Sequence, residues 1–432
     1  MDPYLEERSK YVMRGVALYH PLTIERGENA KLYDVNGKEY LDFTSGIGVA
    51  NLGHANTELI KAAEEQLRKL WHMCFMVVNY APYVELAKRL AEIAPGSSEK
   101  MVLLQNSGSE AIENAIKVAK QVSGRPYIVA YENSFHGRGT YGFALAATGK
   151  YKPYKVGFDP LVPGVELIPY PYCYRCPFNH TYPGCGLACL DYFRKWFSHS
   201  RVPPERVAAV VMEMVQGEGG FVVPPADYVR ELKAYLEENG IMLIDDEVQA
   251  GWGRTGRMWA IDHFGIEPDV MVTAKAIANG LPLSAVIGKK EIMEKTSPGS
   301  FGGTYGGNPV SCAVALKVIE IMRRDNIPGR AQKIGEIMRK RLDEMAEKHR
   351  LIGDVRGLGA MLAIELVKDR RSKEPAAEET AKVIERAREK GLLLLRAGIY
   401  LNVIRLHPPL TIEEENLLRG LDILEESMRE VE

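Results

Sequence analysis

Short runs of continuous apolar residues recur through the middle of the chain, and they predict a parallel β-sheet. Most of these runs are rich in β-branched residues. Apolar residues at every position are typical of strands that helices cover on both faces. Amphipathic segments lie between the runs, such as 227–239, where Val229, Leu232 and Leu236 share one face and Gly240 marks the end. The predicted strands are 101–105, 126–130, 207–212, 241–244, 270–273 and 284–287.

The pattern changes after about residue 308, and the change predicts a second, smaller domain. Helical stretches rich in lysine, arginine and glutamate surround strand-like runs at 359–366, 391–395 and 403–406. A chain of 432 residues is longer than one hydrophobic core usually serves. We therefore predict an α/β fold, with a large domain built on a mostly parallel sheet flanked by helices and a smaller α+β domain. The predicted bounds are 56–307 for the large domain and 308–432 for the small domain.

The first 55 residues are predicted to pack with the small domain, and a partner subunit is the alternative surface for them. Within this segment, 32–41 places Asn36-Gly37 between two β-rich runs, which indicates a hairpin. No internal repeat and no low-complexity tract divides the chain further.

Composition and charge narrow the class of protein. Hydrophobic residues make up 46% and charged residues 26%, which is typical of a compact globular protein. A net charge of -2 argues against nucleic acid as the main partner. The longest apolar runs, such as 392–395, are too short to cross a bilayer, and the first residues lack a secretory signal. We therefore expect a cytoplasmic protein that binds neither nucleic acid nor membrane.

Four of the six cysteines cluster in one segment as a CxxC pair followed by a CxxxC pair. Only eight residues separate the two pairs, which is tight for a structural zinc site, so no metal is predicted. Free thiols, disulfides and a bound metal all remain open as the state of these cysteines, and the segment has no predicted function. The four residues are Cys173, Cys176, Cys185 and Cys189.

Two motifs at strand ends suit a flat, phosphorylated ligand. The predicted strand 101–105 runs into Asn106-Ser107-Gly108-Ser109 and then into a helix. Small residues let a phosphate approach the backbone, and a helix N-terminus offers free N–H donors and a favourable dipole. The motif FHGR follows the next strand, and there Phe135 could stack on a flat ring.

Two further motifs supply an acid and an amine. The apolar strand before DDEVQ delivers Asp245 and Asp246 at its carboxyl end, the edge of a parallel sheet where ligands bind. A carboxylate there can keep a pyridine nitrogen protonated. Lys275 follows the apolar strand 270–273, and a lysine in such a place is costly unless it pairs or reacts. Desolvation lowers the pKa of an amine, which can then form an imine.

The order and spacing of these motifs resemble the class III (ω-amino) aminotransferases, which belong to the fold-type I pyridoxal phosphate enzymes. Asp246 lies 29 residues before Lys275, and Thr304 lies 29 residues after it. The resemblance covers nearly the whole chain. Its motifs are NSGSEA, FHGR, EMVQGEGG, DEVQAGWGRTG, TAKAIANGLP, FGGTYGGNP and NVIRLHPPL.

The resemblance implies a role for each matching residue. Lys275 would hold pyridoxal 5'-phosphate as a Schiff base and move the proton between the substrate Cα and the cofactor C4′. Asp246 would pair with the pyridinium nitrogen, and these two residues would be the catalytic ones. Phe135 and Val248 would cover the two ring faces, and Gln249 would contact the phenolic oxygen. The complete implied cofactor set is Ser107, Gly108 and Ser109 at the phosphate, with Phe135, His136, Glu213, Asp246, Val248, Gln249, Lys275 and Thr304.

The resemblance also implies partners. Thr304 would reach the phosphate in the neighbouring subunit, which makes a homodimer with shared active sites; a dimer of dimers is equally compatible. The small-molecule partners would be an amino acid or amine and a 2-oxo acid.

Two residues bear on the substrate. Glu218 in VQGEGG and Arg405 in NVIRL match a gating pair of the ω-aminotransferases. The arginine would bind the α-carboxylate of glutamate or 2-oxoglutarate, and the glutamate would mask it when an ω-amino donor enters. A static ion pair is the alternative. Ile47, Phe75 and Met76 are further candidates to line the pocket, although core packing would explain them equally well.

Several activities share these motifs. The leading prediction is transfer of an amino group from a donor such as 4-aminobutyrate or ornithine to 2-oxoglutarate. An amino-acid racemase or epimerase, which returns the proton to Cα on the opposite face, has the same lysine and cofactor shell. Decarboxylation of a dialkylated amino acid is a third possibility. A non-catalytic binding protein on this scaffold is disfavoured because Lys275 and Asp246 are both present.

Overall fold

The computed structural model describes residues 2–432, and its centre is a seven-stranded sheet. Six strands run in one direction, and only β10 runs against its two neighbours. The predicted α/β fold with a mostly parallel sheet is therefore confirmed. In sheet order the strands are β4 (Lys100–Gln105), β10 (Ser284–Lys289), β9 (Val270–Thr273), β8 (Met242–Asp246), β7 (Val207–Met212), β5 (Tyr127–Tyr131) and β6 (Val165–Ile168).

The sheet differs from the sequence prediction in two places. The edge strand β6 was not predicted, because its four residues include Glu166 and are mostly half-buried, so they form no continuous apolar run. The strand β8 extends to Asp246 instead of ending at residue 244, so Asp245 and Asp246 belong to the strand itself. The backbone that carries both carboxylates is consequently held by sheet hydrogen bonding and not by a loop.

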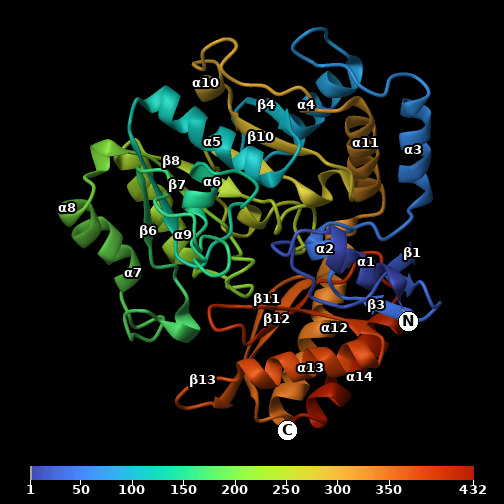
Figure 1. Ribbon diagram of the computed structural model, residues 1–432. Coiled ribbons are helices and arrows are strands. Elements are labelled where there is room, and N and C mark those ends of the chain that lie inside the picture. The colour runs from blue at the N-terminus through green and yellow to red at the C-terminus, as the bar shows by residue number, and fades with distance from the viewer. Residues whose placement is uncertain (1) are drawn as a thin grey trace.

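Helices cover both faces of the sheet (Figure 1). Alternate residues of β7 point to opposite faces, so Val211 packs with the apolar stripe of α5 (Gly108–Ser123) and Val210 packs with that of α9 (Ala226–Glu238). Ser107 and Glu110 form a capping box that starts α5 at a defined residue. The carboxyl end of β4 therefore leads directly into a well-ordered helix N-terminus.

The C-terminal part of the chain forms a second, mainly antiparallel sheet. Its strands, in order, are β11 (Ile352–Leu358), β12 (Met361–Asp369), β16 (Val403–Leu406) and β15 (Leu395–Ala397), with β13 (Glu374–Pro375) paired to β12. The predicted strand 391–395 is wrong as one unit. Its residues divide between β15 and the short strand β14 (Leu392–Leu393), which belongs to another sheet.

That third sheet joins the two ends of the chain. β14 pairs in parallel with β3 (Glu39–Asp42), which continues to β2 (Lys31–Asp34) and β1 (Ile24–Glu28). β2 and β3 form the hairpin predicted at Asn36-Gly37, where Gly37 has a φ of 81°. Figure 1 shows the blue N-terminal strands beside the red C-terminal elements. The proposed domain bounds at residues 55 and 307 stay a prediction.

The remaining helices complete the layers around the three sheets. No helix within residues 2–432 is long and apolar enough to cross a membrane. The helices are α1 (Pro3–Tyr11), α2 (Ser45–Gly48), α3 (Thr57–Leu67), α4 (Ala81–Ile93), α6 (Phe143–Ala147), α7 (Ala188–Asp191), α8 (Ser198–Ser200), α10 (Lys290–Met293), α11 (Pro309–Arg324), α12 (Ile327–Lys348), α13 (Ala377–Glu389) and α14 (Glu414–Arg429).

The four clustered cysteines line one small cavity together with His180, and all four are free thiols. Within the described chain, no three His, Cys, Asp or Glu side chains converge closely enough to hold a metal ion. The segment therefore shows neither a disulfide nor a metal site.

Candidate active site

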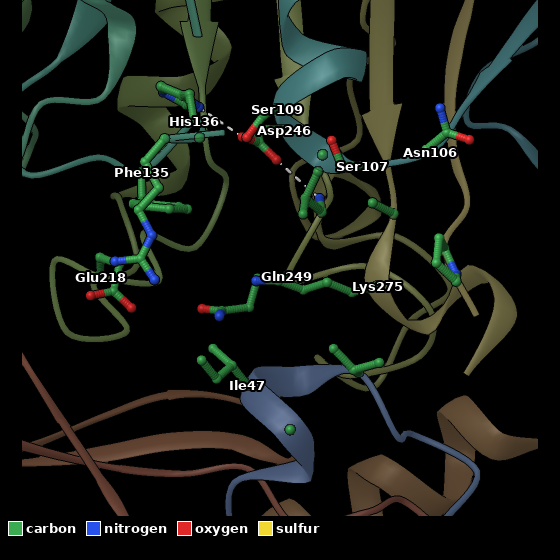
Figure 2. A pocket seen from close by; sticks show the side chains of 18 of the residues that line it. Ile47, Asn106, Ser107, Ser109, Phe135, His136, Glu218, Asp246, Gln249 and Lys275 are labelled. Carbon is green, nitrogen blue, oxygen red and sulfur yellow. Dashed lines mark hydrogen bonds and ion pairs between the residues drawn. The ribbon is translucent and has the colours of Figure 1, made fainter. Parts of the chain in front are cut away.

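The carboxyl ends of the parallel strands meet at one edge of the large sheet, and a cavity of about 390 Å³ opens there. Segments that follow β4, β5, β7, β8 and β9 supply most of its walls. The helix α2 brings Ile47 and the strand β16 brings Arg405. In Figure 2, Ile47 lies across the cavity from Ser107 and Asp246.

Lys275 enters this cavity directly after β9. Its backbone has a φ of 50°, in the left-handed region that costs a residue with a side chain about 1–3 kcal/mol and that is frequent at functional sites. Burial lowers the pKa of its ammonium group to about 8, although the carboxylate of Asp246 acts in the opposite direction. Roughly a tenth of the amine is then free at pH 7, which makes Lys275 a competent nucleophile and base.

Asp246 is held in one orientation at the end of β8. Its side chain is almost fully buried, and Oδ2 lies 2.7 Å from Nδ1 of His136 while Oδ1 accepts a hydrogen bond of 3.0 Å from the backbone N–H of Val248. His136 is equally buried, and its Nε2 has no hydrogen-bond partner among the described residues. This arrangement presents a fixed carboxylate to the cavity.

Ser107, Gly108 and Ser109 form a cradle of small residues at the start of α5. A Cβ at Gly108 would lie 3.0 Å from Val248 Cγ1, so a larger residue there would require the Val248 side chain to shift. Ser109 Oγ accepts a hydrogen bond of 3.3 Å from Gly139 N. The free backbone N–H groups and the dipole of α5 suit an anion at this wall of the cavity.

On the opposite wall, Glu213 holds two backbone segments in place. Its carboxylate accepts hydrogen bonds of 2.8 Å from the backbone N–H groups of Phe135 and Gly217. Burial raises the pKa of Glu213 to about 7, against the opposing charge of His136. Gln249 also faces the cavity, and its buried Oε1 has no hydrogen-bond partner among residues 2–432. That side chain is available to a bound molecule.

Glu218 and Arg405 meet inside the cavity, with Arg405 Nη1 2.7 Å from Glu218 Oε1. Two residues that sequence reasoning missed also bind Glu218. The Tyr154 hydroxyl donates to Oε2 at 3.0 Å, and Lys150 Nζ lies 3.6 Å from the same oxygen. Burial alone would raise the pKa of Glu218, but the charges of Arg405 and Lys150 outweigh it and hold that pKa at about 2. Glu218 is therefore a permanent anion.

Arg138 and Tyr19 were also missed, and both line the cavity. The Arg138 guanidinium lies 5.1 Å from the centre of the Tyr154 ring, and within residues 2–432 it forms no ion pair with a carboxylate. Arg138 follows His136 and Gly137 in the FHGR motif, so that motif was the available signal.

Three of the predicted site residues do not line this cavity within the single chain. Thr304 and Met76 are exposed, and the Phe75 ring stacks on Tyr83 with 3.7 Å between the ring centres. The structure brings the other predicted residues together around one cavity. They are Ile47, Ser107, Gly108, Ser109, Phe135, His136, Glu213, Glu218, Asp246, Val248, Gln249, Lys275 and Arg405.

The cavity fits pyridoxal phosphate chemically. The cradle at Gly108 suits a phosphate, the buried Asp246 carboxylate suits a protonated ring nitrogen, and the Lys275 amine suits an aldehyde. The unpartnered Gln249 amide adds a polar group that a ring substituent would satisfy.

Comparisons with known proteins identify the family. The model of the class III aminotransferases matches residues 12–428. The 4-aminobutyrate aminotransferase GabT of Escherichia coli (strain K12) is 43% identical and covers 99% of this chain and 98% of its own. The leucine/methionine racemase of Thermococcus litoralis is also 43% identical, over 96% of this chain and 92% of its own.

Solved structures agree with this result. An amine transaminase from an uncultivated Pseudomonas species, in its PLP-bound form, superposes with a TM-score of 0.90, at 30% identity and with 98% of each chain covered. Class III aminotransferases depend on pyridoxal phosphate, as the motifs predicted. The chain therefore belongs to the class III aminotransferase family and is a pyridoxal-phosphate-dependent aminotransferase.

Proposed function

We propose that this aminotransferase moves an amino group from an ω-amino donor, such as 4-aminobutyrate or a close homologue, to 2-oxoglutarate, and that Lys275 carries the cofactor. The Glu218–Arg405 ion pair inside the cavity is the observation that carries the proposal. Such a pair lets one site accept two substrates that differ in charge beside the reacting carbon. The similarity to GabT, whose name specifies 4-aminobutyrate, supports the same donor class.

The chain's own residues provide positioning and proton transfer. Bound pyridoxal phosphate supplies an aldehyde carbon that an amine can attack and a ring that withdraws electrons from the substrate. Asp246, oriented by His136, would hold a proton at the ring nitrogen of the bound cofactor. The Lys275 amine, with its lowered pKa, would be the base that accepts a proton from the substrate carbon that bears nitrogen and returns it to the cofactor.

Arg405 and Glu218 adjust the cavity to each substrate. With glutamate or 2-oxoglutarate, the Arg405 guanidinium binds the carboxylate next to the reacting carbon through two parallel hydrogen bonds, and Glu218 moves aside. An ω-amino donor has only hydrogens at that point, so an unpaired buried arginine there would be costly. Glu218 then remains on Arg405 and neutralises it.

Arg138 completes the recognition of both substrates. 4-Aminobutyrate carries its carboxylate at the end remote from the amino group, and glutamate carries a second carboxylate at a similar distance. Arg138 lines the cavity and is free of a carboxylate partner within the described residues, so it suits this distal group. Arg138 then binds the distal carboxylate that both substrates carry, and Arg405 binds the carboxylate that only glutamate carries next to the reacting carbon.

Replacement of Glu218 by glutamine tests the charge switch. The variant keeps the side-chain volume but leaves Arg405 charged beside an uncharged donor carbon, so the KM for 4-aminobutyrate is expected to rise about tenfold, or about 1.4 kcal/mol. The KM for 2-oxoglutarate is expected to change less than about threefold. Steady-state kinetics with each substrate varied measure both. Glu132→Gln, at an exposed acid on the same sheet edge, is the control, and equal changes in both KM values would contradict the switch.

A donor panel tests the reaction class. Purified enzyme is incubated with ω-amino acids of three to five carbons, L-ornithine and L-amino acids, each with and without 2-oxoglutarate. We expect glutamate only when an ω-amino donor and 2-oxoglutarate are both present. Formation of a D-amino acid from its L-form without any 2-oxo acid would instead establish a racemase, the activity named for the Thermococcus litoralis relative.

We further propose that the enzyme is a homodimer with shared active sites. Trp71, Met76, Val77 and Tyr305 are all more than 60% exposed, which is unusual for large apolar side chains that lie close together. Residues 71–77 and the segment around Tyr305 lie side by side, since the His72 and Tyr305 ring centres are 5.2 Å apart. Thr304 lies in the same patch, outside its own cavity and free to reach that of a partner.

Sedimentation equilibrium and kinetics of mixed subunits test the dimer. We expect a dimer or a dimer of dimers at micromolar concentration. Inactive Thr304→Trp and inactive Lys275→Ala chains, refolded together, should regain about a quarter of the wild-type activity, because half of the chains form mixed dimers with one intact site each. A fully active monomer would refute the proposal.

A further inference from the structure

A buried network of charged side chains lies directly behind the turn that carries Glu218. Arg356 in β11 is 9% exposed, and its Nη1 lies 2.7 Å from both Asp354 Oδ2 and Glu365 Oε2. Glu365 in β12 is 1% exposed and also accepts hydrogen bonds from Arg175 Nε and the Tyr172 hydroxyl. Buried charges of this kind are fixed in place, because each would be costly without its partners.

Hydrogen bonds anchor the turn both at its base and at its tip. At its base, Gln216 and Val222 exchange backbone hydrogen bonds of 2.9 and 3.3 Å, and Gly220 N donates to Gly217 O at 3.1 Å. Two further hydrogen bonds tie the tip to the C-terminal sheet. Gly398 N donates to Glu218 O at 3.0 Å, and Arg356 Nε donates to Gly220 O at 2.7 Å. The second of these comes from a charged side chain, and the Glu213 carboxylate also holds the turn by accepting a hydrogen bond of 2.8 Å from Gly217 N.

The register of the C-terminal sheet places Glu365 on the same face as Arg405, the partner of Glu218. Glu365 pairs with Val403, and Ala363 pairs with Arg405, so Glu365 and Arg405 lie on the same face of adjacent strands. Glu365 is nevertheless engaged by Arg356 and Arg175, which leaves Arg405 to Glu218. Glu365 and Glu218 therefore have separate arginine partners.

We propose that Arg356, held by Glu365 and Asp354, is a positioning residue that fixes the Glu218 turn and thereby sets how readily Glu218 leaves Arg405. The proposal rests on the charge switch of the proposed function. With the Gly220 carbonyl held, only the Glu218 side chain moves between substrates, and the ion pair reforms without reordering the backbone. Without Arg356, the turn gains freedom and the paired state of Glu218, which the ω-amino donor needs, becomes less populated.

Arg356→Gln tests this role. We expect the KM for 4-aminobutyrate to rise about five- to tenfold, while the KM for 2-oxoglutarate stays the same or falls and kcat changes less than about twofold. A merely structural role would raise both KM values together and lower kcat. Arg175→Lys is the matched control, because Arg175 binds Glu365 without touching the turn; its KM ratio should equal that of the wild type.

The double variant Glu218→Gln/Arg356→Gln shows whether Arg356 acts through Glu218. We expect the ratio of the two KM values to equal that of Glu218→Gln alone, since the turn then has no charge to position. A further shift of the ratio in the double variant would overturn the proposal. If Arg356→Gln does not fold, Arg356→Lys should shift the ratio in the same direction by a smaller factor, because lysine cannot serve Gly220 and both carboxylates together.

The same measurements separate this inference from the proposed function. If Glu218→Gln leaves the KM ratio unchanged, the charge switch itself fails. If Glu218→Gln shifts the ratio but Arg356→Gln and Arg356→Lys do not, the switch stands and the positioning role of Arg356 is refuted.

Discussion

Replacement of Lys275 by alanine is expected to lower kcat for transamination by at least about 10³-fold, because under the proposed function it removes both the cofactor attachment and the base. Lys275 is the only lysine among the residues that line the cavity in the described chain. Its pKa of about 8 reflects burial at this one position, so a distant lysine cannot supply the same amine. Rapid-mixing absorbance of each half-reaction measures the loss.

Two further variants test whether the loss of activity comes from the missing amine, from the missing positive charge or from non-specific damage to the fold. Lys275→Arg keeps the positive charge but cannot release its proton near neutral pH, and it should be as inactive as alanine. Lys290→Ala, at a half-buried lysine outside the cavity, should retain activity. A small primary amine added to Lys275→Ala should restore part of the rate by occupying the vacated space. Borohydride trapping that maps the cofactor to any other lysine of the wild-type enzyme would contradict the assignment.

The large sheet was predictable because buried parallel strands read as continuous apolar runs. The direction of β10 was not, since a run such as SAVIGK has the same pattern whichever way it points. The leucine run at 391–395 shows a second limit. Its residues divide between two sheets because β14 pairs with β3, more than 300 residues earlier, and no local pattern specifies so distant a partner.

Some residues of the site could likewise be predicted from the sequence, and others could not. Asp246 and Lys275 could be predicted as site residues because one ends a buried strand and the other closely follows one, and the carboxyl ends of parallel strands meet at one edge. Lys150 and Tyr154 lie in the irregular stretch after α6, where no periodicity constrains the side chains. Their contacts with Glu218 arise only from the tertiary fold, which also leaves Thr304 exposed and outside its own cavity.

Asp246→Asn is expected to produce the second large effect, a fall in kcat/KM of about 10²–10⁴-fold. The substitution preserves the volume of the side chain, and the asparagine Oδ1 can still accept the hydrogen bond from Val248 N. A neutral amide cannot hold a proton at the ring nitrogen, so the ring loses its main support as an electron acceptor. Breaking a buried ion pair costs about 3–5 kcal/mol, which corresponds to the stated range.

The neighbouring acid provides a matched control for this prediction. Asp245 lies on the same strand, is completely buried, and burial together with the charge of Glu247 raises its pKa well above the usual value. Asp245 does not line the cavity, so Asp245→Asn should alter kcat/KM less than about threefold. Rapid-mixing kinetics with 4-aminobutyrate compare the two variants. Equal losses in both would show that strand β8 needs its acids for folding, whereas a loss confined to Asp246→Asn would place the ring-nitrogen contact at that carboxylate alone.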